Sequence, residues 1–182
     1  MELAGEGIRL RPWRDGDQEA LARHANDPEV ARNLLERFPS PYRLRDAEAW
    51  IARQKQTSEP TTQFAIEVAG EAGGGIGVQR LDDVYRRTAR VGYWLGRLYW
   101  GRGLATQAVR LVTGYAFATF DFERLEAEVF DWNLASCRVL EKAGYDFESR
   151  QTRRIVKHGF ALDGLLYVRL RPNSGPAAPA EK

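Results

Sequence analysis

Two glycines in the segment Trp100-Gly101-Arg102-Gly103-Leu104-Ala105-Thr106 directly precede a run of residues with helical hydrophobic spacing. Glycine lets the backbone approach a ligand closely, and the N–H groups in the first turn of a helix have no partner inside the helix. The helix dipole adds positive potential at this point, and Arg97 and Arg102 add charge. The segment therefore predicts a site where main-chain amides bind a diphosphate. A tight turn without a ligand is the alternative.

The residues around these glycines argue against two common nucleotide-binding motifs. No Gly-Lys-Ser/Thr follows them, as a P-loop requires. The Gly-x-Gly-x-x-Gly fingerprint of dinucleotide-binding folds and its acidic partner are incomplete. Nucleotide hydrolysis and dinucleotide binding are therefore disfavoured.

A second group of polar residues follows further along the chain. Glu126 and Glu128 alternate within a predicted strand, so their side chains share one face. Asn133 is the expected N-cap of the next helix, and Ser136 lies in its first turn. Each has a structural alternative, because surface glutamates are common and both Asn and Ser cap helices.

The elements that must position these residues combine strand and helix patterns. Gly73 to Gly75 are expected to form a turn between two strands, and three neighbouring strands are expected to form an antiparallel meander. In chain order we predict a strand at 8–12, a helix after a capping box at 15–18, a helix around 47–54, strands at 64–68, 76–81 and 88–95, a helix at 103–120, a strand at 125–130, a helix at 133–143 ended by Gly144, and two final strands.

Composition limits the class of protein. The chain has 182 residues with 43% hydrophobic and 29% charged, which suits one globular domain at 1–172 and a disordered tail at 173–182. The net charge of +2 argues against a dedicated nucleic-acid or membrane-surface binder. A basic run at 150–157 is more typical of a solvated strand edge than of a nucleic-acid site.

The expected compartment is the cytoplasm. Met1 to Gly7 lacks the features of a signal peptide, and no apolar stretch has the length of a membrane-spanning helix. Cys137 is the single cysteine, so the chain has no internal disulfide. We expect a small buried side chain at this position in preference to a catalytic thiol.

Three motifs, in this order, resemble the GNAT N-acetyltransferase superfamily, in the branch of the ribosomal-protein N-terminal (alanine/serine) acetyltransferases. The likeness covers Ile8 to Arg171, and Trp100 replaces the polar residue that opens the family's glycine motif. The motifs are Gly92-Tyr93-Trp94-Leu95 with Tyr99 to Thr106, then Asn133-Leu134-Ala135-Ser136, then Leu140-Glu141-Lys142-Ala143-Gly144-Tyr145. The resemblance implies an α/β fold of the α+β type, with a mixed, mostly antiparallel sheet of about seven strands and helices on both faces.

The resemblance also implies acetyl-CoA as the acyl donor, without a metal. Its diphosphate would lie on the amides of Gly101 to Thr106, and its pantetheine arm would enter a splay between the strands after Leu95 and after Leu125. The binding residues so implied are Trp94, Leu95, Trp100, Gly101, Arg102, Gly103, Leu104, Ala105, Thr106, Asn133 and Ser136.

Acetyl transfer needs a neutral amine, a polarised thioester carbonyl and a proton for the leaving thiolate. By resemblance, a main-chain N–H at a strand bulge near Trp94 and Leu95 polarises the carbonyl. The same resemblance implies Glu128 as the general base and Ser136 as the acid. Leu140 replaces the tyrosine acid of other N-terminal acetyltransferases.

Other proton carriers stay open as alternatives, namely Tyr93, Tyr145 and His158. His158 with Gly159 is typical of a hairpin turn, and His24, on the apolar face of its helix, is expected to pack inside. If no residue serves as the acid, the alternative function is a non-catalytic acyl-CoA-binding module on the same fold.

The acceptor is expected to be a primary amine of a protein N-terminus or of a small molecule, attacking directly in a ternary complex. Residues 26–54 and 155–167 are expected to form the walls of its site. Exposed edge strands leave a homodimer open, and no membrane partner is expected. Six acidic side chains are candidates for attracting a cationic amine, namely Asp17, Asp27, Glu36, Asp82, Asp83 and Asp163.

Overall fold

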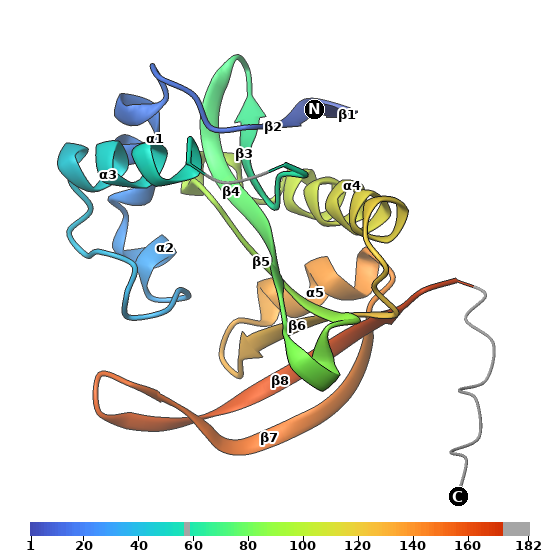
Figure 1. Ribbon diagram of the computed structural model, residues 1–182. Coiled ribbons are helices and arrows are strands. Elements are labelled where there is room, and N and C mark those ends of the chain that lie inside the picture. The colour runs from blue at the N-terminus through green and yellow to red at the C-terminus, as the bar shows by residue number, and fades with distance from the viewer. Residues whose placement is uncertain (57–58, 173–182) are drawn as a thin grey trace, which may run out of the picture.

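The computed structural model describes residues 1–56 and 59–172, and the tail predicted at 173–182 lies outside the described residues. Groups of strands and helices follow one another along the chain (Figure 1). In chain order they are β1 (Leu3–Gly5), β2 (Ile8–Arg11), α1 (Gln18–Ala25), α2 (Pro28–Ala31), α3 (Leu44–Gln54), β3 (Gln63–Val68), β4 (Glu71–Arg80), β5 (Thr88–Leu95), α4 (Leu104–Thr119), β6 (Arg124–Phe130), α5 (Leu134–Lys142), β7 (Asp146–Lys157) and β8 (Phe160–Leu170), with 3-10 turns at Asp83–Tyr85 and Arg97–Tyr99.

The strands form one eight-stranded sheet in the order β1-β2-β3-β4-β5-β6-β8-β7. The β5–β6 pair is parallel, and every other neighbouring pair is antiparallel. The predicted mixed, mostly antiparallel sheet is confirmed, with β1 as an additional strand that the sequence patterns did not indicate. Short α2 was also missed, and it begins where the Asp27 carboxylate accepts a hydrogen bond from Glu29 N at 2.8 Å.

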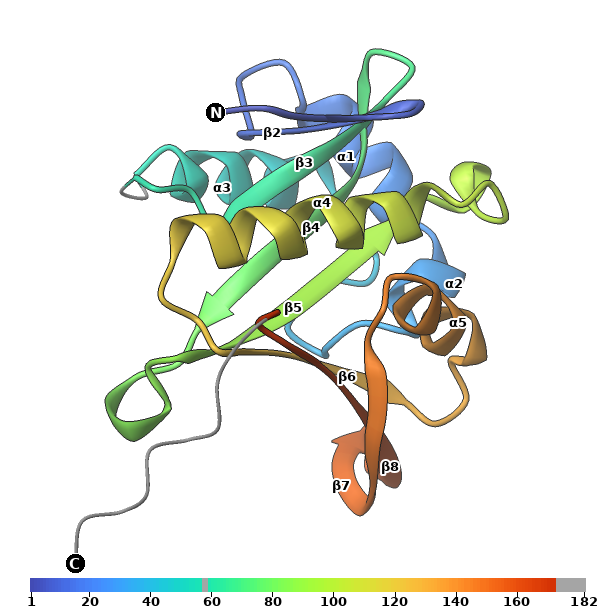
Figure 2. The same cartoon turned by 90° about the vertical axis from the view of Figure 1, so that its right-hand side faces the viewer.

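Helices cover both faces of the sheet, as expected. Figure 2 shows α4 crossing one face, with α1 and α3 on the opposite side. Alternate residues of β5 separate the two cores, because neighbouring side chains on a strand point to opposite faces. Val91 and Leu95 belong to the core beneath α4 and α5, whereas Trp94 packs against the core formed by α1 and α3.

The prediction that Gly73 to Gly75 form a hairpin turn is wrong. They lie inside β4, and the chain reverses at Ala69 and Gly70, which have φ values of +51° and +87°. The glycines are needed for close approach. A Cβ on Gly73 would lie 2.5 Å from the Tyr99 ring, and one on Gly74 would lie 2.4 Å from a main-chain oxygen of β5.

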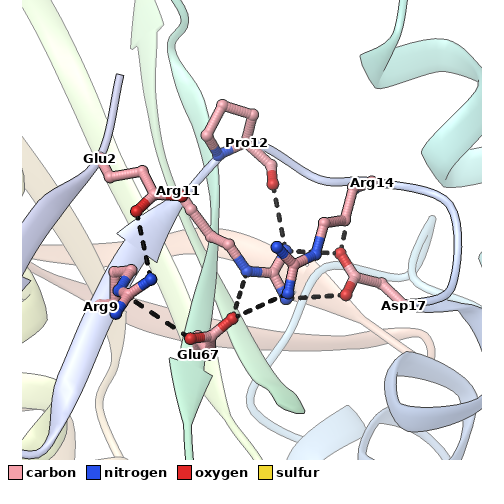
Figure 3. A network of polar contacts seen from close by, with 7 residues as sticks. All are labelled: Glu2, Arg9, Arg11, Pro12, Arg14, Asp17 and Glu67. Atoms are coloured by element: carbon pink, nitrogen blue, oxygen red, sulfur yellow. Dashed lines mark hydrogen bonds and ion pairs between the residues drawn. The ribbon is translucent and has the colours of Figure 1, made fainter. Parts of the chain in front are cut away.

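The predicted capping box at 15–18 is also wrong. Asp17 occupies the N-cap position of α1 without a side-chain cap bond. Its buried carboxylate instead accepts hydrogen bonds from Arg11 at 2.7 and 2.8 Å, while Arg11 Nε donates to Glu67 at 2.5 Å (Figure 3). Burial lowers the pKa of Arg11, but the hydrogen bonds that Arg11 donates to Asp17 and Glu67 outweigh it and leave that pKa raised. Asp17 is therefore not available to attract a substrate amine.

Two predicted turns are confirmed. Gly144 follows α5 with φ of +88°, and His158 and Gly159 join β7 to β8 with φ values of +50° and +82°. Positive φ at both central residues matches the twist of a two-residue hairpin. Within residues 1–56 and 59–172, no helix is both long and apolar enough to cross a membrane.

Candidate functional site

The glycine-bearing bend lies at the end of β5 and leads directly into α4. Gly101 and Gly103 have φ values of +74° and +76°, and Gly103 is the N-cap of the helix without any side-chain cap. The N–H groups of Leu104, Ala105 and Thr106 therefore have no partner inside the helix. A Cβ on either glycine would meet no atom within 4 Å, so neither glycine is packed against the rest of the protein. These features fit the diphosphate of CoA.

Side chains around the bend fix its position against β5. Trp100 Nε1 donates to Leu95 O at 2.7 Å, which links the bend to the end of the strand. The guanidinium of Arg102 lies over the Tyr99 ring, 5.9 Å from its centroid. Arg97 approaches Asp27 at 4.0 Å. Arg102 thus remains close to the open amides and adds positive charge there.

The two central strands diverge beside this bend. Parallel pairing of β5 with β6 covers Thr88 to Arg90 and Arg124 to Glu126, and none of the described pairs extends it. Beyond that point β5 continues along β4 and β6 continues along β8, and Figure 2 shows the two strands separating. The splay therefore starts at Arg90, earlier in β5 than the predicted opening after Leu95.

Main-chain groups of β5 face this splay. Gly96 N donates to Gly73 O at 2.8 Å, and bonding pairs alternate along an antiparallel ladder. Tyr93 and Leu95 therefore point their N–H and C=O groups away from β4. The β4–β5 register contains no shift over its described pairs, so the bulge expected near Trp94 is wrong for this ladder. The donors offered to a ligand are those of a regular strand.

Ser136 and Tyr93 meet at the side of the splay nearest α5. Tyr93 Oη lies 2.7 Å from Ser136 Oγ, and Asn133 Oδ1 accepts a hydrogen bond from Ser136 N at 3.2 Å. Burial raises the pKa of the Tyr93 phenol, so the phenol stays protonated at neutral pH. The two hydroxyls therefore form a protonated pair at this side of the splay. Asn133 also caps α5, which was the structural alternative to its expected role in binding the cofactor.

The other two candidate proton carriers lie elsewhere. The Tyr145 hydroxyl is 2.8 Å from Thr113 Oγ1 in the core, and burial raises the pKa of Tyr145 to about 12. His158 lies in the exposed β7–β8 turn, with its Nδ1 3.6 Å from Glu36. Neither is hydrogen-bonded to Ser136.

Glu128 and Glu126 share one face of β6, as predicted, but differ in their partners. Glu126 accepts from Arg124 Nε at 2.8 Å. The carboxylate of Glu128 has a looser partner, Arg154 Nε, at 3.8 Å. Both glutamates line a hollow of about 110 Å³ on the sheet face opposite α4. The carboxylate of Glu128 is therefore held less tightly than that of Glu126 at the edge of this hollow.

Glu71, Tyr99 and His24 form a hydrogen-bonded cluster next to the bend, which was not predicted from the sequence. Tyr99 Oη donates to Glu71 Oε1 at 2.6 Å, and His24 Nε2 lies 2.8 Å from the same oxygen. These two hydrogen bonds lower the pKa of Glu71 to about 2. His24 is buried, as expected. Its place on the apolar helix face was the one available signal, because nothing local marks Glu71.

The two segments predicted to form the acceptor walls touch each other. Lys157 Nζ donates to Ala31 O at 3.2 Å and to Leu34 O, and His158 N donates to Glu36. In Figure 1 the β7–β8 hairpin extends beneath the α2 region. The contact brings the hairpin and the 26–43 segment together on the side of the sheet where Glu128 lies.

Comparison with known proteins identifies the family. The family model described as "Acetyltransferase (GNAT) domain" matches residues 8–146. The Probable N-acetyltransferase YjcK of Bacillus subtilis is 39% identical over 101 residues, which is 54% of this chain and 56%, about half, of that relative. The Spermidine N(1)-acetyltransferase of Escherichia coli is 24% identical over 161 residues, covering 88% of this chain and 82% of that enzyme.

Solved structures agree in fold. The structure of RimL, a ribosomal L7/L12 alpha-N-protein acetyltransferase in complex with coenzyme A, superposes with a TM-score of 0.81. It is 16% identical and covers 93% of this chain and 98% of that chain, so the likeness concerns the fold. Together with the amide-lined bend, the match over residues 8–146 shows that the chain belongs to the GNAT family and is an acetyl-CoA-dependent N-acetyltransferase.

Proposed function

We propose that the chain acetylates a primary amine, the α-amine of a protein N-terminus or an amine of a small molecule, by direct attack in a ternary complex. The observation that carries the proposal is the separation of β5 from β6 beyond Arg90 and Glu126, beside the open amides that follow Gly101. Beside this splay, the Glu128 carboxylate lies on one face of the sheet, and the hydroxyls of Tyr93 and Ser136 lie on the other. Acetyl-CoA, when bound, supplies the activated acetyl group.

The donor would be held by main chain. The amides of residues 101–106 would bind the diphosphate, and the N–H and C=O groups of Tyr93 and Leu95 would pair with the pantetheine arm. Trp94 and Trp100 flank this path, and Arg102 adds charge beside it. Leu95 O already accepts a hydrogen bond from the Trp100 indole at 2.7 Å. The N–H and C=O groups of Tyr93 are therefore more available to the pantetheine arm than those of Leu95.

In the proposed reaction, the groups on the two faces of the sheet take part in separate proton transfers. As the amine nitrogen bonds to the acetyl carbon and the C–S bond breaks, the amine proton passes to Glu128. The sulfur receives a proton from the Ser136 hydroxyl, which recovers one through its hydrogen bond with Tyr93 or from water. Glu128 then releases its proton to water, and the Ser136–Tyr93 pair takes one back from water, so the sum of these steps is amide plus free thiol with no net proton change.

The test of this proposal compares Glu128→Gln with Glu126→Gln. Removing a general base lowers the rate by about 10²–10⁴-fold, so we expect Glu128→Gln to lower kcat strongly with little change in CoA affinity. Glu126→Gln is the matched control, on the same strand face, with its carboxylate bonded to Arg124. Unchanged turnover in Glu128→Gln would remove Glu128 from the mechanism.

The acceptor class is tested by a panel that includes Ala- and Ser-starting peptides, polyamines and aminoglycosides. Two relatives motivate this range, because one is named for spermidine and the RimL structure is named for a ribosomal protein N-terminus. No transfer to any amine, with acetyl-CoA bound, would refute the proposed activity.

A further inference from the structure

The hollow beside Glu128 is open to solvent and is lined by two arginines that are more exposed than its carboxylates. The lining residues are Arg90, Glu126, Glu128, Gln151, Arg154 and Leu166, around a volume of about 110 Å³. The side chains of Arg90 and Arg154 are 54% and 57% exposed, against 18% for Glu126 and 38% for Glu128. A ligand entering the hollow therefore meets guanidinium groups first.

Neither guanidinium is held tightly. Arg90 Nε lies 3.9 Å from Glu126, and Arg154 Nε lies 3.8 Å from Glu128, distances too long for hydrogen bonds. Neighbouring ion pairs on the same face are much shorter, since Arg124 reaches Glu148 at 2.5 Å. Among the described residues, no side-chain hydrogen bond joins Arg90 or Arg154 to a partner, so both keep free donors.

The other carboxylate of the hollow is already neutralised, because Arg124 Nε donates to Glu126 at 2.8 Å. Asp131 and Asp163, which pair with Arg150, belong to the opposite face of the sheet, since a Cβ on neighbouring Gly164 would point at Glu128. Among the residues that line the hollow, a second cation of a polyamine would therefore find no unpaired carboxylate besides Glu128, and it would be repelled by Arg90 and Arg154.

We propose that the acceptor amine carries a nearby anionic group, a carboxylate or a phosphate, which Arg90 and Arg154 bind while the amine meets Glu128. The inference rests on the proposed function and names the chemical class of its acceptor. Guanidinium groups suit this task because they bind carboxylate and phosphate oxygens through paired, charge-assisted hydrogen bonds. The volume of the hollow suits one such group.

The experiment measures kcat/KM on matched acceptors. The peptide amides Ala-Glu-Ala-Ala, Ala-Gln-Ala-Ala and Ala-Lys-Ala-Ala differ only in their second residue, whose side chain is anionic, neutral or cationic. β-Alanine and aminoethyl phosphate, each compared with ethanolamine, test small anionic amines. Spermidine is the polycation. We expect the wild-type protein to prefer at least one anionic acceptor over its neutral counterpart by about tenfold or more, the scale of a charge-assisted contact.

Arginine variants then locate the preference. In Arg154→Gln and Arg90→Gln, the anionic-to-neutral ratio should fall toward one. An effect on Glu128 itself cancels in this ratio, because both acceptors meet the same variant. The control is Arg9→Gln on β2, which removes an equally exposed arginine paired with Glu2 at 3.3 Å, and it should keep the wild-type ratio.

Each outcome decides the question. Preference for a peptide or for a small amine identifies the source of the anion, and both support the inference. A wild-type ratio near one for every pair, a preference for spermidine, or an unchanged ratio in both arginine variants would overturn it while leaving acetyl transfer intact. Failure to acetylate any amine would instead refute the proposed function. CoA binding by calorimetry verifies that each variant is folded.

Discussion

Replacing Gly103 by alanine should separate the role of the bend in CoA binding from its role in folding. Gly103 has φ of +76° and is the N-cap of α4, and an added Cβ would meet no protein atom within 4 Å. The cost in the free protein is therefore conformational, about 1–2 kcal/mol for an L-residue in the left-handed region. For a chain of this size, that corresponds to a fall in Tm of roughly 2–8 °C.

The effect of Gly103→Ala on the affinity for CoA should be larger than its effect on stability. The added methyl group enters the space where the diphosphate would lie, or turns one amide away from it. Losing one hydrogen bond to a charged group costs about 1.5–3 kcal/mol, which is roughly a 10- to 100-fold rise in Kd. Titration calorimetry with CoA, at a temperature well below the Tm of the variant, measures this change directly.

Gly114→Ala is the matched control, because Gly114 lies within the same helix and also has open space around it. Alanine in a helix interior should stabilise the protein by up to about 1 kcal/mol, and the Kd for CoA should not change. If Gly103→Ala lowered the Tm as expected but kept the CoA affinity within twofold of wild type, the diphosphate would not be held at this bend.

Three further changes test other parts of the structure. Ser136→Ala should lower kcat by about 10²-fold or more while keeping CoA affinity, and unchanged pre-steady-state transfer would exclude the hydroxyl as the proton donor. Because hydrogen bonds lower the folded-state pKa of Glu71 to about 2, its stabilising effect is present above its ordinary pKa near 4.5 and is lost as the pH falls through 2. Thermal unfolding between pH 2 and 6 should thus be less acid-sensitive in Glu71→Gln, and equal slopes would contradict this. Arg11→Ala leaves the Asp17 carboxylate buried without its partner and should cost about 3–5 kcal/mol of unfolding free energy, whereas exposed Arg9→Ala should cost less than about 1 kcal/mol in denaturant unfolding.

Features that depend on local chemistry could be predicted from the sequence. Hydrophobic spacing located α4 and α5, glycine marked the bend at Gly101 and Gly103, and Gly144 was predicted as the left-handed residue that ends α5. These predictions succeed because helix period and positive φ are properties of a few consecutive residues. The motif order also indicated the fold family, which the match over residues 8–146 confirms.

Predictions from local patterns were wrong where a distant segment of the chain contacts the same residues. Gly73 to Gly75 have the composition of a turn, yet they lie inside β4 because Tyr99 and β5 pack too closely for side chains. Asp17 has the chemistry of a helix cap, yet its carboxylate binds buried Arg11. In both cases a tertiary contact outweighed a local preference.

The residues that meet at the site are brought together by contacts between segments far apart in the chain. Tyr93 and Ser136 are 43 residues apart in the chain, and their hydroxyls come within 2.7 Å because α5 packs beside the open part of β5. The hollow that joins Arg90, Glu128 and Arg154 needs four strands, β5, β6, β8 and β7, in this order. Strand order and register depend on the total apolar surface that the sheet buries in its two hydrophobic cores. No short segment of sequence determines that total.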